Sequence, residues 1–272
     1  MPSVEIHGTP IFYREHGRGL PCLVMHGGLG LDHTYLSALD ALDDMLHLVY
    51  YDHRGNGRSG RPPLDTITFE QLCADADALR AHLGFERVAV LGHSGGGFIA
   101  LEFALRYPQR LSHLLLVTTA PRLEFGSPAM LARMERKGMT PAMRAVVEKP
   151  LEDDTALEHF FRTMAPLYYH TYDAAVVERQ IRDIIFDAGA FKRGLALAAG
   201  WKATLRLGEI RAPTLIIAGG DDVIYPPADA EVLHRGIAGS ELVVFERSGH
   251  HPYVEEPEAF VNALRGWIRR HC

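Results

Sequence analysis

Cysteine is scarce in this chain of 272 residues, and its spacing argues against two kinds of protein. Cys22, Cys73 and Cys272 are odd in number, so they cannot all pair within one chain. None of them forms the C-x-x-C or C-x-x-H spacing that is typical of a metal site. The sequence therefore favours neither a disulfide framework nor a cysteine-based metal centre, and it indicates a reducing compartment.

Long apolar runs and clusters of like charge are also missing. No stretch approaches the roughly 18 apolar residues that a membrane-spanning helix needs, and residues 1–6 lack the pattern of a secretory signal. The 28 basic and 34 acidic residues give a formal charge of −6, with no long run of like charge to bind nucleic acid or an anionic membrane. We expect a cytoplasmic protein whose partner is a small molecule, with no nucleic-acid or membrane partner. Assembly into a homo-oligomer stays open.

Short apolar runs without polar alternation recur along the chain, and they are typical of strands that are buried on both faces. Apolar residues make up 47% of the sequence and charged residues 23%, which is ordinary for a globular protein. Such runs favour a parallel sheet, here preceded by an antiparallel hairpin. The predicted strands are 4–7 and 11–16 in the hairpin, followed by 22–25, 46–51, 88–91, 114–117, 215–218 and 242–245.

Helical patterns lie between these strands. In residues 68–83 apolar side chains repeat at spacings of four and three, and Thr68 with Gln71 predicts a capping box at the start. Further helices are predicted at 96–106, 228–235 and 257–270. Because strands alternate with helices, we predict an α/β fold with a doubly wound, mostly parallel sheet of eight strands.

The alternation breaks between residues 121 and 205, where the sequence is rich in Met and helical in pattern. We expect an inserted helical cap here, and a core made of two segments, 1–120 and 206–272. Prolines are expected to interrupt the helices of the cap at Pro128, Pro141, Pro150 and Pro166.

One predicted strand-to-helix turn holds a serine between glycines. Residues 92–96 read Gly-His-Ser-Gly-Gly and match the pattern G-x-S-x-G between a strand and a helix. Small residues permit so tight a turn, and the helix start directs N–H groups toward whatever bonds to Ser94. A phosphate-binding loop would need a different glycine spacing and a following Lys. We interpret Ser94 as a nucleophile.

A serine nucleophile needs a base, which is usually a histidine oriented by a carboxylate. Of the fifteen histidines, His250 follows the last predicted strand, where an open α/β sheet places its ligands. His251 is adjacent, and we expect only one of the two to point inward. Asp221 and Asp222 both follow the strand 215–218 and compete for the role of the acid. The order Ser, Asp, His is the one that accompanies a G-x-S-x-G turn.

The loop after strand 22–25 reads His-Gly-Gly-Leu-Gly. Acyl transfer requires N–H donors for the oxyanion, one from the residue after the nucleophile and one from such a loop. We predict the amides of Gly28 and Gly95 as these donors, and a turn role for Gly27. His26 is not expected to bind a metal because no further ligands occur at a usable spacing. The sequence predicts neither a metal nor a cofactor.

These residues together resemble the α/β-hydrolase superfamily, and the resemblance covers essentially the whole chain. The resemblance implies the α/β-hydrolase fold with a cap, and a triad of Ser94, Asp222 and His250. In this family the acid usually lies three residues after a Gly and four before a Pro, so Gly219 and Pro226 select Asp222. The matching segments are His26-Gly27-Gly28, residues 52–59, residues 92–96 and residues 249–257.

The loop at 26–30 looks like that of the proline iminopeptidase group, which has Pro in place of Leu29 and Trp in place of Gly95. That group binds a free amino terminus through carboxylates of its cap. The acidic candidates for this role are Glu148, Glu152, Asp153 and Asp154.

Because Gly95 departs from that pattern, we expect instead a serine hydrolase that cleaves a small carboxylic ester or lactone through an acyl-enzyme, an activity of the carboxylesterase type (EC 3.1.1). A proline iminopeptidase is the first alternative, and a ligand receptor on a hydrolase scaffold is the second. The residues predicted to contact the substrate under the cap are Leu29, Tyr168, Tyr169 and Ile224.

Overall fold

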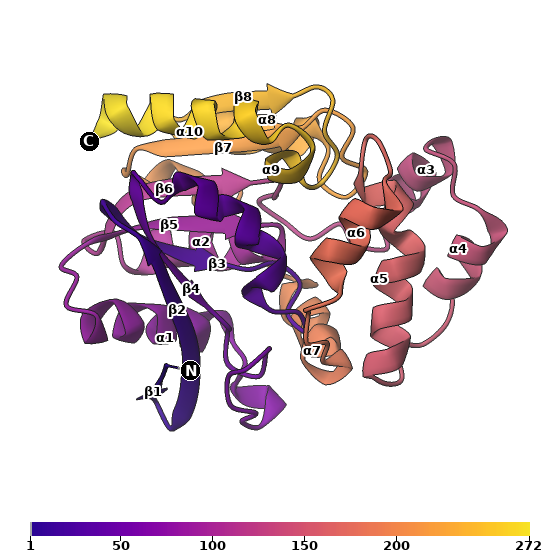
Figure 1. Ribbon diagram of the computed structural model, residues 1–272, viewed down its shortest axis with the longest axis horizontal. Coiled ribbons are helices and arrows are strands. Elements are labelled where there is room, and N and C mark those ends of the chain that lie inside the picture. Colours follow the sequence, from indigo (N-terminus) through magenta and orange to yellow (C-terminus); the bar gives the residue numbers. More distant parts are fainter. Residues whose placement is uncertain (1) are drawn as a thin grey trace.

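The computed structural model describes residues 2–272, which form a central sheet with helices on both faces and a group of helices at one end (Figure 1). Eight strands pair in the order β1-β2-β4-β3-β5-β6-β7-β8. The pairs β1–β2 and β2–β4 are antiparallel, and the other five are parallel. The strands are β1 (Ser3–Ile6), β2 (Thr9–Gly17), β3 (Leu20–Met25), β4 (Leu46–Tyr51), β5 (Val88–His93), β6 (Leu111–Val117), β7 (Thr214–Gly219) and β8 (Glu241–Phe245). The predicted sheet is confirmed in number of strands and in direction.

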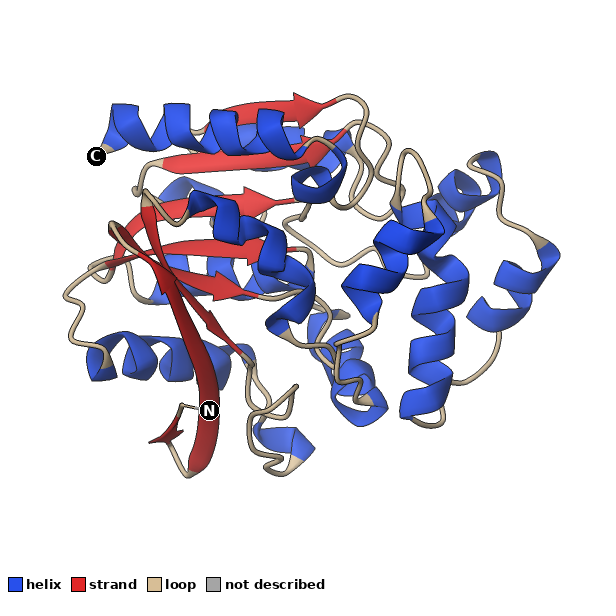
Figure 2. Ribbon diagram, viewed as in Figure 1, coloured by secondary structure: helices blue, strands red, loops and turns tan. Residues whose placement is uncertain are grey.

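Helices lie on both faces of the sheet (Figure 2). Alternate side chains of the central strands pack into the two layers between the sheet and these helices. Leu23 and Val90 face one layer, while their neighbours Val24 and Leu91 face the other, as the two-residue period of a strand requires. The first layer contains α1 (Phe69–His82), α2 (Gly95–Arg106) and α8 (Pro227–Gly236). The second contains the 3-10 helix η1 (His33–Leu42) and α10 (Pro257–His271). Two short 3-10 turns, η2 (Leu64–Thr66) and η3 (Leu207–Glu209), and the short helix α9 (Pro252–Glu255) complete the core.

Five helices lie between β6 and β7 and cover the end of the sheet where the parallel strands finish (Figure 1). Apolar side chains of these helices, several of them Met, pack against Val223 and Ile224 in the loop that follows β7. All five fall inside the predicted insertion 121–205, whose exact boundaries stay a prediction. The helices are α3 (Pro128–Arg136), α4 (Pro141–Val147), α5 (Asp154–Tyr168), α6 (Ala174–Ile181) and α7 (Ala188–Ala198), and we call them the cap.

Two local predictions were wrong. Thr68 does cap α1 by accepting a hydrogen bond from the Gln71 amide at 3.1 Å, but the side chain of Gln71 donates to Asp75 instead of completing a capping box. Pro166 lies inside α5 rather than interrupting it, and the helix continues to Tyr168. A proline two residues before a helix ends removes one hydrogen bond without preventing that last turn.

No helix of residues 2–272 is both long enough and apolar enough to cross a membrane.

Candidate active site

Four loops meet where the parallel strands end, and each carries a predicted site residue. The loop after β3 contains Gly28, the turn after β5 contains Ser94, the loop after β7 contains Asp222, and the loop after β8 contains His250. Parallel strands present all their carboxyl ends at one edge of the sheet, so residues far apart in sequence gather there.

Ser94 occupies a strained turn between β5 and α2. Its φ is +54° and its ψ is −125°, a combination that residues with a Cβ rarely adopt. Two hydrogen bonds hold this backbone: the Ser94 amide donates to the carbonyl of Val117 at 3.0 Å, and the Thr119 hydroxyl donates to the carbonyl of Ser94 at 2.7 Å. The neighbouring strand β6 and the residues after it therefore fix the position of the serine side chain.

His250 and Asp222 form a buried pair. Nδ1 of His250 lies 2.8 Å from Oδ2 of Asp222, and each residue is only 3% exposed. The other carboxylate oxygen accepts hydrogen bonds from the amides of Ile224 (2.8 Å) and Tyr225 (3.2 Å). Because an ionised carboxylate only accepts, Nδ1 of His250 carries the proton, and Nε2 is left free to act as a base.

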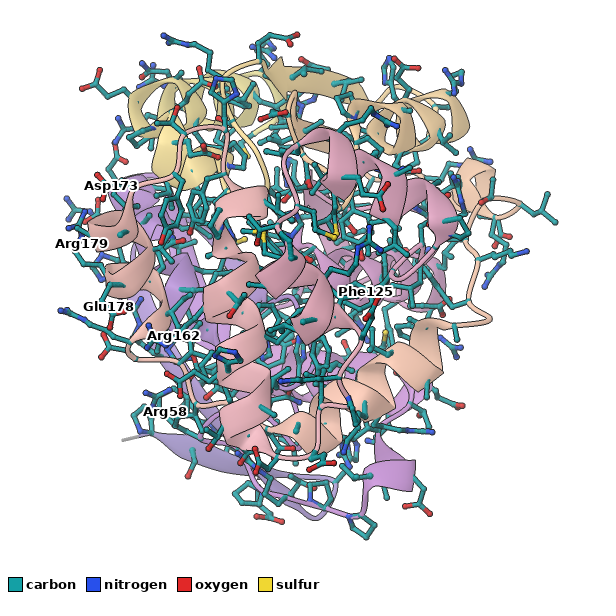
Figure 3. All side chains as sticks on the ribbon, turned by 90° about the vertical axis from the view of Figure 1, so that its right-hand side faces the viewer. Arg58, Phe125, Arg162, Asp173, Glu178 and Arg179 are labelled. Atoms are coloured by element: carbon teal, nitrogen blue, oxygen red, sulfur yellow. The ribbon has the colours of Figure 1, made fainter. Side chains whose placement is uncertain are left out.

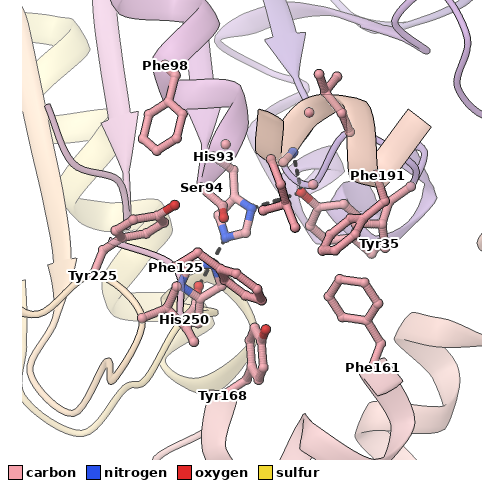
Figure 4. A pocket seen from close by; sticks show the side chains of 18 of the residues that line it. Tyr35, His93, Ser94, Phe98, Phe125, Phe161, Tyr168, Phe191, Tyr225 and His250 are labelled. Atoms are coloured by element: carbon pink, nitrogen blue, oxygen red, sulfur yellow. Dashed lines mark hydrogen bonds between the residues drawn. The ribbon is translucent and has the colours of Figure 1, made fainter. Parts of the chain in front are cut away.

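Ser94 and His250 line the same cavity (Figure 4), although no hydrogen bond joins their side chains in the described residues. Catalytic hydrogen bonds are often long before substrate binds and tighten in the complex. The structure therefore brings the three predicted triad residues to one site, with the Asp222–His250 contact already formed.

Asp221 and His251, the sequence neighbours of Asp222 and His250, differ in their position relative to the cavity. Asp221 is 41% exposed and forms an ion pair with Lys137 at 2.8 Å, so it is turned away from His250. His251, by contrast, lines the cavity together with His250, and the expectation that only one of them points inward was wrong. The two rings cross at 75°, which lets both reach the cavity from adjacent positions. Burial, followed by the charges of His250 and His93, lowers the pKa of His251 well below its usual value.

The backbone amides of Gly28 and Gly95, both near Ser94, have no acceptor within residues 2–272. A Cβ on Gly95 would lie 3.2 Å from the Gly28 nitrogen, so the two residues face each other. The Gly27 amide, in contrast, donates to the hydroxyl of Tyr35 at 2.7 Å. A Cβ on Gly27 would lie 2.6 Å from the Cβ of Ser94, which explains why glycine is required there. This geometry agrees with the predicted donors, whose role stays a proposal.

Residues of the segment 52–59 form hydrogen bonds that hold the loop 26–30 in place. The amide of Gly30 donates to Oδ1 of Asn56. Nδ1 of His26 donates to the carbonyl of Gly27 at 3.1 Å, and its Nε2 accepts from the amide of His53 at 3.2 Å. Both nitrogens of His26 are therefore used to fix the backbone of the loop.

Two residues that connect these loops, Tyr35 and His93, were not predicted from the sequence. Their side chains lie 2.9 Å apart, and Nε2 of His93 lies 3.0 Å from the carbonyl oxygen of His250. Burial, with a smaller contribution from the charge of His250, lowers the pKa of His93 well below its usual value, so its ring is neutral. The G-x-S-x-G pattern does not specify the residue before the serine, and no signal in the sequence pairs it with Tyr35.

An apolar cavity of about 150 Å³ lies between the edge of the sheet and the cap. The four predicted substrate contacts Leu29, Tyr168, Tyr169 and Ile224 all line it. No Asp, Glu, Lys or Arg of the described chain does so. Its lining also includes aromatic residues that the sequence did not single out: Phe98, Phe125, Phe161, Phe191 and Tyr225.

The acidic residues of the cap have structural or surface positions. Asp153 caps α5 by accepting from the amide of Ala156 at 2.8 Å, and Asp154 accepts from the amide of Ala188 at 2.8 Å. Glu148 and Glu152 are exposed. Figure 3 shows the same outward placement for the charged side chains of α5 and α6, such as Arg162, Glu178 and Arg179. None of the four acidic candidates reaches the cavity.

Comparison with known proteins agrees with this architecture. The family described as alpha/beta hydrolase fold matches residues 21–257, and the chain belongs to that family. The predicted superfamily is thereby confirmed, and the protein is a hydrolase of this fold.

Similar proteins include peptidases, esterases and lactonases. The proline iminopeptidase PfmaB of Pestalotiopsis fici is 28% identical over 279 residues, which cover 98% of this chain and 99% of that protein. A thermophilic esterase from Thermogutta terrifontis is 27% identical, with a TM-score of 0.79 over 100% of this chain and 99% of its own. The enol-lactonase from Burkholderia xenovorans LB400 is 25% identical, with a TM-score of 0.79 over 98% of this chain and 100% of its own.

Proposed function

We propose that this protein is a serine hydrolase that cleaves a small, uncharged carboxylic ester or lactone through an acyl-enzyme. The observation that carries the proposal is the position of Ser94 at an apolar cavity that no carboxylate of residues 2–272 lines. The buried Asp222–His250 pair supplies the base, and the free amides of Gly28 and Gly95 supply the oxyanion donors.

In this mechanism Nε2 of His250 takes the proton of the Ser94 hydroxyl while the oxygen attacks the carbonyl carbon. Asp222 stabilises the resulting imidazolium, and the negative oxygen accepts hydrogen bonds from Gly28 and Gly95. The tetrahedral intermediate collapses, and the leaving oxygen receives the proton from His250. Water then repeats the sequence on the acyl-enzyme, releasing the acid and restoring Ser94.

The lining of the cavity favours an ester or lactone over a prolyl peptide. A free amino terminus is cationic at neutral pH, and burying it without a counter-charge is costly. No carboxylate of the described residues lines the cavity to balance that charge. The named relatives include proteins of both kinds, a proline iminopeptidase on one side and an esterase and an enol-lactonase on the other. The uncharged wall is the observation that supports an ester or lactone as the substrate.

Steady turnover of p-nitrophenyl butanoate tests whether the protein is an enzyme or a receptor. Ser94→Ala should lower kcat by a factor on the order of 10^4 or more, because no other group replaces the nucleophile. Ser37→Ala, at an exposed serine of η1, is the matched control and should keep full activity. A receptor on the same scaffold would show no turnover of esters, lactones or prolyl amides.

A second comparison tests the choice of substrate. The purified protein is given p-nitrophenyl butanoate and proline p-nitroanilide under the same conditions, and kcat/KM is measured for both. We expect the ester to be preferred by orders of magnitude. A preference for the prolyl anilide would show that the cavity accepts a cationic amine, and the assignment would then pass to an iminopeptidase.

A further inference from the structure

The hydroxyls of Tyr168 and Tyr225 face the cavity, and neither forms a hydrogen bond with another group of residues 2–272. Their rings pack against the ring of His250, with centroid distances of 5.5 Å and 5.9 Å. Figure 4 shows both side chains beside His250 with their hydroxyl oxygens turned toward the cavity. Tyr168 comes from the cap and Tyr225 from the loop after β7, so the pair joins both parts of the fold.

The other tyrosines of the same cavity are satisfied. The hydroxyl of Tyr35 accepts from Gly27 and contacts His93, and that of Tyr169 donates to Gln180. Tyr168 and Tyr225 are at most 9% exposed and their hydroxyls open onto the cavity, so a polar group inside the cavity is the partner available to them. Because Tyr168 and Tyr225 lie next to His250, we expect a group of the substrate to be the hydrogen-bonding partner of their hydroxyls.

The chemistry of that partner follows from the charges around it. Burial, with a smaller effect of the Asp222 charge, raises the pKa of both Tyr168 and Tyr225, so both hydroxyls keep their protons at neutral pH. Each can donate one hydrogen bond and accept others. No Lys, Arg, Asp or Glu of the described chain lines the cavity, so a charged group on the ligand would lack a counter-charge.

We propose that Tyr168 and Tyr225 form a second polar subsite that binds an uncharged oxygen of the substrate, a ketone or a hydroxyl, separate from the scissile carbonyl. This inference rests on the proposed ester or lactone hydrolysis and specifies its substrate. The preferred substrate is an oxygenated ester or lactone rather than a plain alkyl ester.

Matched pairs of esters test the subsite. p-Nitrophenyl 4-oxopentanoate and p-nitrophenyl pentanoate differ by one ketone on the acyl side, and 3-hydroxybutyl butanoate and butyl butanoate differ by one hydroxyl on the alcohol side. For each pair the ratio of kcat/KM, oxygenated over plain, is measured in the natural protein and in Tyr168→Phe and Tyr225→Phe. Comparing ratios between proteins cancels the intrinsic reactivity of each ester.

We expect the ratio of at least one pair to fall about tenfold in at least one variant, as the loss of one hydrogen bond predicts. Phenylalanine keeps the ring, and the fold loses no hydrogen bond. Tyr107→Phe is the control, since that hydroxyl also has no side-chain partner but lies outside the cavity lining. A ratio that is lowered equally in Tyr107→Phe would contradict the subsite.

Ratios that stay unchanged in both variants, while plain esters are still turned over, would overturn the subsite and leave the proposed hydrolysis intact. Absence of turnover with every ester would overturn both. Calorimetric binding of 4-oxopentanoate esters to the Ser94→Ala protein gives a readout without turnover, and Tyr225→Phe or Tyr168→Phe in that background should weaken it about tenfold relative to the pentanoate esters.

Discussion

The hydroxyl of Tyr35 lies 2.9 Å from Nδ1 of His93, and this contact links the loop after β3 to the loop that contains His250. The Gly27 amide donates to the Tyr35 oxygen at 2.7 Å, so the Tyr35 proton is free to be donated to His93. Nε2–H of His93 then donates to the carbonyl of His250 at 3.0 Å. Along this path each donor has one acceptor. The neutral ring of His93 therefore accepts at Nδ1 and carries its proton on Nε2. Tyr35 and His93 are therefore positioning residues.

Tyr35→Phe should impair catalysis through this path. The variant leaves the Gly27 amide and Nδ1 of His93 without partners, which should cost about 1–3 kcal/mol of stability. Because the loop after β3 and His250 are no longer linked, we expect kcat to fall at least tenfold while KM changes about twofold or less. Ester kinetics well below the melting temperature measure both parameters.

Tyr50→Phe separates positioning from simple loss of stability. Tyr50 is buried in β4, outside the cavity lining, and its hydroxyl donates to Asp40 at 2.8 Å. This control should lower the melting temperature but leave kcat near that of the natural protein. An equal fall of kcat in both variants would show that Tyr35 acts only through stability.

Asp222 and Asp221 can be distinguished by amide substitutions. Asp222→Asn keeps the shape of the side chain but presents the wrong partner to Nδ1–H of His250, so kcat should fall by roughly 10^3 to 10^4. Asp221→Asn alters a half-exposed ion pair with Lys137 and a 3.3 Å contact with Nδ1 of His170, and it should change kcat less than about twofold. The reverse order of effects would transfer the role of the acid to Asp221.

The sheet and the positions of the candidate triad residues could be predicted because their signals are local. Unbroken apolar runs mark buried strands; Ser94 directly follows one of them, and His250 lies in the loop after another. The contact of Tyr35 with His93 and the place of Tyr225 depend on how η1, the cap and the loop after β7 meet in space. No periodicity encodes such contacts. Pro166 shows that a local signal can also mislead. The proline predicts a helix break, but it had little effect because it lies so near the end of α5.

Phe161 limits the size of the cavity, and its removal should shift the preferred chain length. Its ring lies within about 6 Å of those of Phe186 and Phe191, with centroid distances of 6.0 Å and 5.6 Å. Phe161→Ala would enlarge a cavity of about 150 Å³. Each additional buried CH2 contributes about 0.8 kcal/mol, so the ratio of kcat/KM for octanoate over butanoate esters should rise tenfold or more. An unchanged ratio would place the acyl chain elsewhere in the cavity.

Buried neutral histidines should make the fold sensitive to acid. Burial is the largest cause that lowers the pKa of four of them, His26, His53, His93 and His251. In the unfolded chain each takes up a proton near pH 6.5, whereas the folded chain excludes it. The unfolded state therefore binds more protons as the pH falls below about 6.5, and the free energy of unfolding decreases by up to about 1.4 kcal/mol per pH unit for each histidine.

Urea unfolding at pH 7.5, 6.5 and 5.5 measures this slope. His53→Leu should make it shallower by about one proton, because neither ring nitrogen of His53 has a partner and leucine requires none. His159→Gln, at an exposed position of α5, controls for the loss of a histidine as such. If His53→Leu left the slope as steep as before, His53 would have to be protonated in the folded state, which the absence of any partner for its ring in the described residues argues against.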